Sequence, residues 1–230
     1  MQLKKIFFEY LNKLELPEIK NEFIDNIVEY FLELKEWNKK FNLIGLKSDE
    51  DIIVKLFVDS LYFAKLDKVS HCETILDIGS GAGFPGIPNA LYFKDKQFFL
   101  IESNKKKCSF LKNIKEKLSI NNIEIINERA EKLSKMDNYI EKFDCALIKA
   151  LAKFNIALKL SLPFIKKSGY CVYYASNKQR FEIISNNKLC NLLGFKIDNI
   201  FDYNLNNSGQ RCLIIVKKMW KTDNNKKCST

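Results

Sequence analysis

Hydrophobic residues recur at helical spacing over the first part of the chain. One apolar stripe runs from Phe7 to Leu14, and a longer one runs from Phe23 to Leu34. The pattern breaks over 37–45, where we expect a connecting loop. Ser48 precedes three acidic residues and has the position of an N-cap, so a further helix is expected over 49–64.

Beyond a short polar link, the spacing changes to short apolar runs that alternate with helical stripes. Strands are expected at 75–78, 97–102, 123–127, 143–148, 170–174, 195–201 and 211–217, and helices at 87–93, 105–118, 130–136, 154–165 and 181–193. Near-continuous apolar strands that alternate with helices are typical of a parallel sheet with both faces covered. The turn-forming residues 206–209 predict a hairpin between the last two strands, and hence an antiparallel edge strand.

The chain is therefore predicted to be an α/β protein in three parts. These are a helical extension over 1–65 packed on the core, an α/β domain over 66–217, and a polar basic tail over 218–230. No apolar run approaches the roughly 18 charge-free residues that a membrane span needs, and Glu9 comes too early for a signal peptide. We expect a cytoplasmic monomer that does not enter membranes.

Composition limits the chemistry that is available. The seven cysteines include no Cys-x-x-Cys pair and are expected to be reduced thiols. His71 is the only histidine and no nucleophile motif accompanies it, so neither a catalytic triad nor a metal site is expected. The formal net charge of +10 favours an acidic partner such as nucleic acid. However, nearly all of this charge is lysine, which a biased genome composition explains equally well.

The most informative stretch, 74–88, runs from an apolar strand into four of the eight glycines and then into two prolines. A strand, a tight turn and a helix N-terminus in this order form the usual cradle for a nucleotide-like ligand. Gly81 begins a G-x-G-x-x-G of dinucleotide enzymes, whereas Asp77 begins a D-x-G-x-G-x-G of S-adenosylmethionine enzymes. Gly79 follows the strand directly, and the Asp77 carboxylate would repel a pyrophosphate. Both observations favour S-adenosylmethionine.

Residues at the ends of the next three strands complete the expected ligand site. Glu102 is placed to accept hydrogen bonds from both ribose hydroxyls, a role common to both classes of cofactor. The segment 127–131 follows the third strand, where an adenine would lie. Lys149 ends the fourth strand and would face the methyl-donor end of the cofactor.

Four stretches carry a resemblance to a known family, namely 37–43 with 58–60, 76–88, 102–111 and 122–131. The chain resembles the bacterial 16S ribosomal RNA methyltransferase G family, formerly called glucose-inhibited division protein B. The G-x-P-G-x-P extension of the glycine loop is the most family-specific part. The resemblance, which covers nearly the whole chain, implies a Rossmann-like class I S-adenosylmethionine-dependent methyltransferase fold with an antiparallel last strand. It also implies methylation of N7 of a guanine in 16S rRNA.

The resemblance implies cofactor contacts at Gly79, Phe84, Ala130, Glu131 and the basic position Lys149. With the motif residues, the expected cofactor-binding set is Asp77, Gly79, Gly81, Gly83, Phe84, Glu102, Ala130, Glu131 and Lys149. Three positions depart from the family pattern: Lys149 replaces an arginine, Lys55-Leu56 replaces Arg-His, and Ala175-Ser176 replaces a Lys-Gly pair. Lysine keeps the charge of arginine but lacks its planar fork.

The expected chemistry asks little of side chains, because guanine N7 carries an in-plane lone pair and has no proton to lose. No general base is required, and catalysis depends on alignment of the reacting atoms. We expect Lys149, Asn38 and Lys55 to position the substrate, and Lys55, Arg129 and Lys149 to bind the RNA. The expected partner is 16S rRNA or the small ribosomal subunit.

Other functions remain open at this point. A methyltransferase that acts on a protein or a small molecule would carry the same glycine loop. A non-catalytic module that binds RNA through its lysines would show no S-adenosylmethionine binding. A dehydrogenase is less favoured, and saturable NAD binding would revive it.

Overall fold

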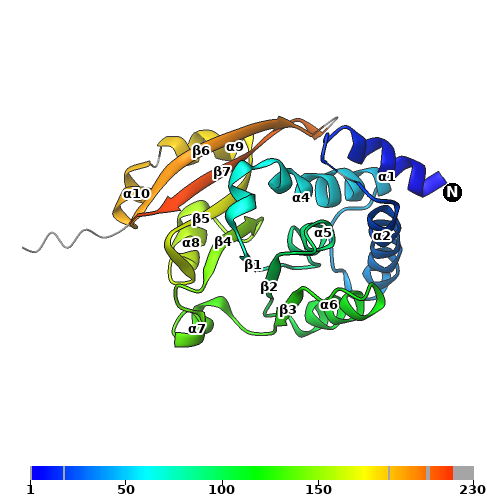
Figure 1. Cartoon of the computed structure of the whole chain (residues 1–230), viewed down its shortest axis with the longest axis horizontal. Coiled ribbons are helices and arrows are strands. Elements are labelled where there is room, and N and C mark those ends of the chain that lie inside the picture. The colour runs from blue at the N-terminus through cyan, green and yellow to red at the C-terminus, as the bar shows by residue number, and fades with distance from the viewer. Residues whose placement is uncertain (1, 18, 186, 206–207, 220–230) are drawn as a thin grey trace, which may run out of the picture.

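A computed structural model of the chain describes residues 2–17, 19–185, 187–205 and 208–219 (Figure 1). This described part contains a seven-stranded sheet with the order β3-β2-β1-β4-β5-β7-β6. The strands are β1 (Thr74–Ile78), β2 (Gln97–Ile101), β3 (Ile123–Ile126), β4 (Phe143–Lys149), β5 (Ile165–Ser176), β6 (Phe195–Asn204) and β7 (Gln210–Lys218). The predicted α/β class with a mostly parallel sheet is confirmed.

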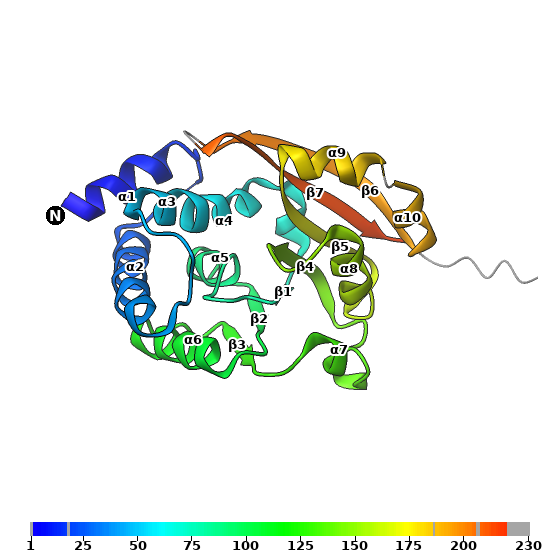
Figure 2. The ribbon, with the colours of Figure 1, turned by 180° about the vertical axis from the view of Figure 1, so that it is seen from behind.

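Helices cover both faces of the sheet, as Figure 1 and the reverse view in Figure 2 show. One face carries α1 (Gln2–Asn12), α2 (Asn21–Phe41), α3 (Asp49–Ile52), α4 (Asp59–Leu61), α5 (Gly86–Tyr92) and α6 (Lys105–Lys117). The other carries α7 (Ala130–Leu133), α8 (Phe154–Ser161), α9 (Asn177–Ser185) and α10 (Asn187–Leu192). A π-helical segment (Ile53–Val58) joins α3 to α4, and 3-10 helices span Tyr62–Lys65, Asp67–His71 and Asp137–Tyr139.

Successive residues of the central strands face two separate cores. Ile75 and Leu147 pack with the helices of the N-terminal side, whereas Leu76 and Ala146 pack with α7 to α10. Side chains alternate across a strand, so a strand that is covered on both faces is apolar throughout. The N-terminal helices therefore share one core with the sheet.

The strand β7 is antiparallel to both of its neighbours, β5 and β6. The antiparallel last strand is confirmed, and the edge strand is β6, which pairs with β7 in the antiparallel direction. The chain crosses from β5 to β6 through α9 and α10, and β7 then turns back into the gap between them. Residues 206–207 of the expected hairpin turn and 220–230 of the expected tail lie outside the described residues.

The loop expected over 37–45 is wrong in its first half, because α2 continues to Phe41. The ring of Trp37 packs against Phe110 of α6, with centroids 5.5 Å apart. This contact with a distant helix keeps the last turns of α2 helical. The helix ends where Asn42 adopts a left-handed backbone conformation, with φ of 49°.

The helical region expected over 49–64 is confirmed, together with its cap. The Ser48 hydroxyl accepts a hydrogen bond from the Asp51 N–H at 3.0 Å. The region is not a uniform α-helix, because the π-helical segment interrupts it and a 3-10 turn ends it. The Asp59 side chain that follows the π-helical segment points into the core and is fully buried.

Candidate active site

The carboxyl ends of β1, β2, β3 and β4 meet at one edge of the sheet, because these strands are parallel. From β1 the chain moves outward to β2 and β3, and then returns to place β4 on the other side of β1. Ligands of open α/β sheets bind outside the carboxyl ends of the strands at such a reversal. The glycine-rich segment 79–86 follows β1 at this point.

The segment 79–86 is a compact turn that is attached to the end of β2. The N–H groups of Gly79 and Ser80 both donate to the Ile101 carbonyl, at 2.9 and 3.0 Å. The Gly83 N–H donates to the Ser80 carbonyl at 2.7 Å. These backbone hydrogen bonds hold the turn against the end of β2.

Three glycines of this turn have positive φ: Gly79 (72°), Gly81 (59°) and Gly83 (93°). They differ in what surrounds them. A Cβ on Gly83 would lie 2.5 Å from the hydroxyl of Tyr30, so α2 closes the turn from behind. A Cβ on Gly81 would meet nothing closer than the Gly79 carbonyl oxygen at 3.9 Å and the Lys107 ammonium at 4.0 Å. The turn is thus open at Gly81.

Glu102 follows β2 and faces the open side of the turn. One carboxylate oxygen accepts the Gly81 N–H at 2.9 Å, and the other accepts the Asn104 N–H at 2.7 Å. The side chain is buried. A carboxylate offers about four acceptor sites, so these two hydrogen bonds leave capacity for further donors such as two vicinal hydroxyls.

Asp77 lies in β1 beneath the turn and is buried. Its Oδ2 accepts the Gly86 N–H at 2.8 Å, whereas its Oδ1 has no hydrogen-bond partner among the described residues. A Cβ on Gly86 would lie 2.7 Å from Oδ2, so glycine is needed where α5 approaches the strand. Burial raises the pKa of Asp77 to about 7, although the Gly86 N–H and Lys149 partly oppose the shift.

We expect the stability of the ligand-free protein to fall with rising pH because of Asp77. Its pKa of about 7 in the folded state lies above the ordinary value of 3.8. The folded state therefore holds the proton of the Asp77 carboxyl more tightly than the unfolded state does. The stabilisation of the folded state by this proton is fully present below pH 4 and is lost as the pH rises through 7. A shift of this size corresponds to about 4 kcal/mol. In urea unfolding at several pH values, Asp77→Asn should gain stability relative to the wild type across this range; a constant difference between the two proteins would contradict the prediction.

Lys149 ends β4, and its side chain reaches towards the N-terminal helices. Its Nζ lies 2.8 Å from Asp59 Oδ2 and donates to the Lys55 carbonyl at 2.8 Å. The other oxygen of Asp59 accepts the Tyr203 hydroxyl at 2.6 Å and lies 3.2 Å from Arg211 Nε. Burial lowers the pKa of Lys149, and Asp59 offsets part of this effect. We call Asp59, Lys149, Tyr203 and Arg211 the Asp59 cluster; it ties α4 to β4, β6 and β7.

The remaining residues of the expected cofactor set differ in exposure. Phe84 is buried and stacks on Tyr30, with ring centroids 5.2 Å apart. Ala130 is buried at the start of α7, whereas Arg129 and Glu131 on either side of it are exposed. The structure therefore gathers Asp77, Gly79, Gly81, Gly83, Phe84 and Glu102 around the turn and places Ala130 and Glu131 after the neighbouring strand β3.

Two of the expected RNA-positioning residues make local contacts. The Asn38 side-chain oxygen accepts the Ile44 N–H at 2.8 Å. The Lys55 ammonium lies 2.6 Å from Asp51 Oδ1, one helical turn earlier. RNA would have to compete with these two contacts and with the ion pair between the buried Lys149 and Asp59. The RNA-binding and positioning roles of these residues stay predictions.

A family model described as rRNA small subunit methyltransferase G matches residues 23–211. The chain belongs to this family. It is 41% identical to the ribosomal RNA small subunit methyltransferase G of Dictyoglomus thermophilum over 84% of this chain and 80% of that protein. It is 34% identical to the protein of the same name from Clostridium novyi over 96% and 93% of the two chains. The predicted resemblance is confirmed.

Solved structures place the methyltransferase G chain in a broader fold class. The O-methyltransferase from Bacillus cereus, solved in complex with SAH, matches with a TM-score of 0.59 and 16% identity, over 83% of this chain and 90% of that one. A SAM-dependent methyltransferase from Aquifex aeolicus matches with a TM-score of 0.56 and 13% identity, over 77% and 97%. At such low identity these matches concern the fold alone, and they confirm the predicted class I methyltransferase architecture.

Of the Asp59 cluster in this methyltransferase G chain, sequence reasoning singled out only Lys149 and missed Asp59, Tyr203 and Arg211. Asp59 itself entered only as part of a family stretch. A signal for it exists, because a carboxylate between Phe57 and Leu61 on an otherwise apolar helix face must find a partner in the core. Tyr203 lies 144 residues away from Asp59, and no spacing rule links positions so distant.

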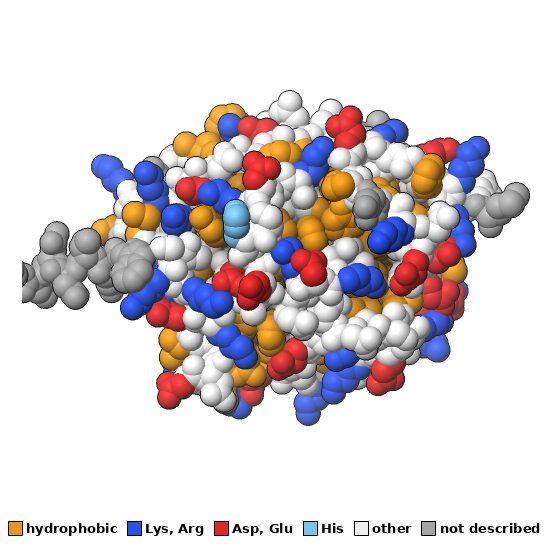
Figure 3. Space-filling model, in the orientation of Figure 1, with side chains coloured by type: hydrophobic (Ala, Val, Ile, Leu, Met, Phe, Trp, Pro, Cys, Tyr) orange, Lys and Arg blue, Asp and Glu red, His pale blue; other side chains and the backbone are white. Residues whose placement is uncertain are grey.

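The described residues contain no group of three or more His, Cys, Asp or Glu that could hold a metal ion. His71 is exposed at the end of a 3-10 helix, at the opposite edge of the sheet from the turn; Figure 3 shows it at the surface. Within the same part of the chain, no helix combines the length and the apolar character needed to cross a bilayer.

Proposed function

We propose that this methyltransferase G chain transfers a methyl group from S-adenosylmethionine to N7 of a guanine in 16S rRNA. Membership in the family supports the role of this chain as a methyltransferase of small-subunit rRNA. The observation that supports the site best is the pairing of Glu102 with the Gly81 N–H beside an open glycine turn, at the reversal of strand order. The choice of guanine N7 rests on the family resemblance and on the chemistry below.

The residues at the turn fit S-adenosylmethionine. Gly81 leaves space above the backbone, Glu102 keeps acceptor capacity for a ribose, and the buried carboxylate of Asp77 favours a cationic ligand. The proposed cofactor-binding residues are Asp77, Gly79, Gly81, Gly83, Phe84, Glu102, Ala130, Glu131 and Lys149. When bound, S-adenosylmethionine supplies an electrophilic methyl group.

The proposed reaction requires alignment rather than proton transfer. Guanine N7 has no proton to lose, so the chain needs no general base at the acceptor. The exposed His71 at the far edge of the sheet agrees with this. Holding the two reactants in near-attack geometry can supply on the order of 7–11 kcal/mol. Lys149, Asn38 and Lys55 are the proposed positioning residues, and Lys55, Arg129 and Lys149 are proposed to contact the RNA.

The proposed location of the protein in the cell follows from the location of its proposed substrate. Small-subunit rRNA of bacteria lies in the cytoplasm, and we propose that the chain acts there as a monomer. The proposed parts are the helical extension 1–65 and the methyltransferase domain 66–217, which share the N-terminal core described above.

We expect the purified protein to transfer radiolabelled methyl groups from S-adenosylmethionine to small-subunit rRNA, with the label at N7 of one guanine. Naked rRNA and assembled subunits are tested in parallel. Glu102→Ala should abolish the transfer because it removes the proposed ribose acceptor, whereas Glu124→Ala, exposed on β3, is the matched control. Label on an exocyclic amine or on ribose would disprove the N7 assignment. If neither RNA substrate accepts label, a protein or small-molecule acceptor replaces RNA.

A further inference from the structure

A second hollow lies at the same edge of the sheet as the glycine turn, beside β5 and β7. Its volume is about 450 Å³, and it is lined by Asn177, Arg180, Phe181, Asp202, Tyr203, Asn204, Gln210 and Arg211. Asn177 begins α9 directly after the carboxyl end of β5. In the sheet, Ser176 at that end of β5 pairs with Arg211 of β7. We call this hollow the α9 groove.

The α9 groove is enriched in arginine. Only three of the 38 basic residues of the chain are arginines, and two of them, Arg180 and Arg211, line this groove. On the face drawn in Figure 3, basic and acidic side chains are interspersed. Arginine presents a planar fork that contacts phosphates bidentately and stacks on aromatic rings or bases, which lysine cannot do.

Arg180 is oriented by its neighbours and keeps free hydrogen-bonding capacity. Its Nε lies 3.1 Å from Asp202 Oδ1, and its Nη2 donates to Asp202 Oδ2 at 3.3 Å. A guanidinium has five N–H donors, so this pair leaves donors for an anion. Its side chain is 29% exposed. Asp202 therefore fixes the plane of the guanidinium without covering it.

Phe181 provides an aromatic surface next to this guanidinium. Its side chain is 63% exposed, although it stands on a helix that buries Ile183 in the core. The Arg180 Cζ lies 5.8 Å from the centre of its ring. An exposed aromatic ring beside an arginine is the combination that stacks an unpaired base while the cation meets the backbone phosphate.

The Asp59 cluster connects the α9 groove to the end of β4. Arg211 lines the groove and pairs with one oxygen of Asp59, whose other oxygen pairs with Lys149. Lys149 ends β4, the strand next to β1 and its glycine turn. The groove is therefore two strands away from the turn, along one continuous edge of the sheet.

We propose that the α9 groove binds an unpaired nucleotide of the substrate RNA next to the target guanine. A base stacks on Phe181, the adjoining phosphate pairs with Arg180, and the amides of Asn177, Asn204 and Gln210 meet polar edges of the RNA. Apart from the rings of Phe181 and Tyr203, the lining of the groove is polar or charged and has no continuous apolar patch, which favours RNA over a protein partner. The proposal rests on the proposed function and names how its substrate is held.

The test measures RNA binding and methyl transfer separately, with the full chain. Binding is followed by fluorescence anisotropy of a short labelled single-stranded RNA that contains guanine. Phe181→Ala should weaken binding about tenfold or more, because it removes one stacked base, and should raise the KM for rRNA by the same factor. Phe181→Trp should bind as the wild type does. Leu192→Ala, which removes an 83% exposed apolar side chain of α10, is the matched control and should change neither value.

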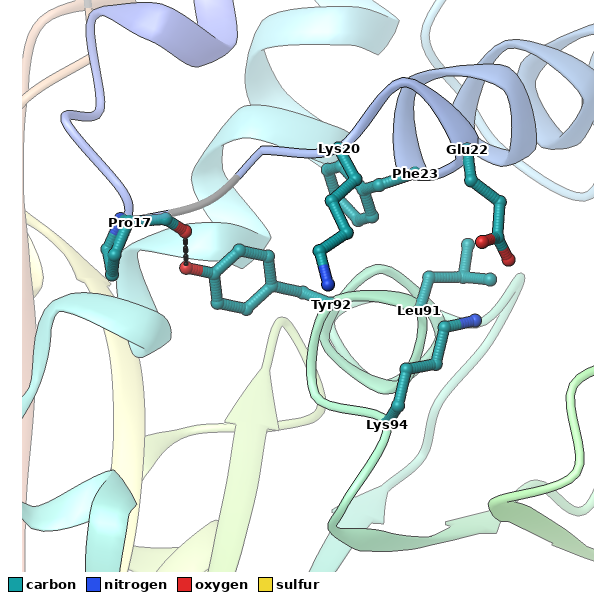
Figure 4. Close-up of a pocket in the computed structure, with 7 residues that line it drawn as sticks. All are labelled: Pro17, Lys20, Glu22, Phe23, Leu91, Tyr92 and Lys94. Atoms are coloured by element: carbon teal, nitrogen blue, oxygen red, sulfur yellow. Dashed lines mark hydrogen bonds between the residues drawn. The ribbon is translucent and has the colours of Figure 1, made fainter.

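Arg180→Ala should also weaken RNA binding and should reduce the slope of log K against log salt by about 0.7, because one phosphate contact is lost. Its control is Lys94→Ala at the opposite edge of the sheet. Figure 4 shows Lys94 reaching over another hollow, together with Lys20 and Tyr92. Affinity for S-adenosylmethionine, measured by calorimetry, should be unchanged in Phe181→Ala and in Arg180→Ala.

The outcomes separate the groove from the proposed function. If Phe181→Ala and Arg180→Ala bind the RNA as the wild type does, the groove proposal is overturned, even when methyl transfer to rRNA is intact. If the wild type transfers no methyl group to rRNA and Phe181→Ala still loses RNA affinity, the proposed function fails and the groove stands. If the variants lose affinity only for assembled subunits and not for naked RNA, the occupant is a ribosomal protein and the proposal is overturned.

Discussion

Replacing Gly81 by aspartate is expected to weaken S-adenosylmethionine binding at least about 100-fold, or about 3 kcal/mol. The space above Gly81 is the open part of the turn, and its left-handed φ of 59° disfavours any side chain. The new carboxylate would occupy that space beside Glu102, which already accepts the Gly81 N–H. Lys107, 4.0 Å from the position of the new Cβ, would pair with it and hold it over the turn. Isothermal titration calorimetry measures the loss directly.

Gly81→Asn separates bulk from charge in this experiment. Asparagine has the size of aspartate and tolerates the left-handed conformation better than most residues, but it is neutral and cannot form the ion pair with Lys107. We expect it to bind the cofactor more weakly than the wild type and more tightly than Gly81→Asp. A dissociation constant for Gly81→Asp within about threefold of the wild-type value would show that the turn is not the cofactor site.

Removing the Asp59 carboxylate is expected to destabilise the fold by about 3–5 kcal/mol. Asp59 is fully buried and is the shared counter-charge of Lys149 and Arg211, which Asp59→Ala would leave in the core without it. The desolvation of both cations would then be uncompensated. The midpoint and slope of urea unfolding give the change in free energy.

The matched control for Asp59 is Asp51→Ala, which breaks an exposed ion pair with Lys55 on the same helical region. Exposed pairs contribute little, so its unfolding midpoint should stay near that of the wild type. Asp59→Asn keeps an acceptor for the Tyr203 hydroxyl and should fall between the other two variants. If Asp59→Ala unfolds at the same urea concentration as the wild type, the cluster does not hold α4 on the sheet.

Local chemistry explains which parts of the fold were predictable from the sequence. The turn after β1 depends on positive φ at Gly79, Gly81 and Gly83, a conformation that glycine adopts readily. The position of the turn and the class of its ligand could therefore be predicted from the sequence. The cap at Ser48 is equally local. The strands were predictable because a strand that is covered on both faces is a continuous run of apolar residues, and such a run is visible in the sequence.

The features that the sequence could not predict share a different cause, which is contact between distant segments. The end of α2 depends on Trp37 meeting Phe110, and the place of β7 depends on a gap that the crossover from β5 to β6 leaves open. The same holds for the candidate site. The expected roles of Lys149 toward the ligand and the RNA stay predictions, and only the structure shows Asp59 as its partner.

The place of β7 also determines the order in which the sheet can be completed. A ribosome synthesises β5 and β6 before β7, although β7 is the strand that joins them. Until residues 210–218 have emerged, the β5 edge has no neighbour and β6 has no contact with the sheet. An unpaired strand edge is where a nascent chain pairs with the wrong partner. Completion of this sheet during synthesis therefore waits for β7 to emerge from the ribosome.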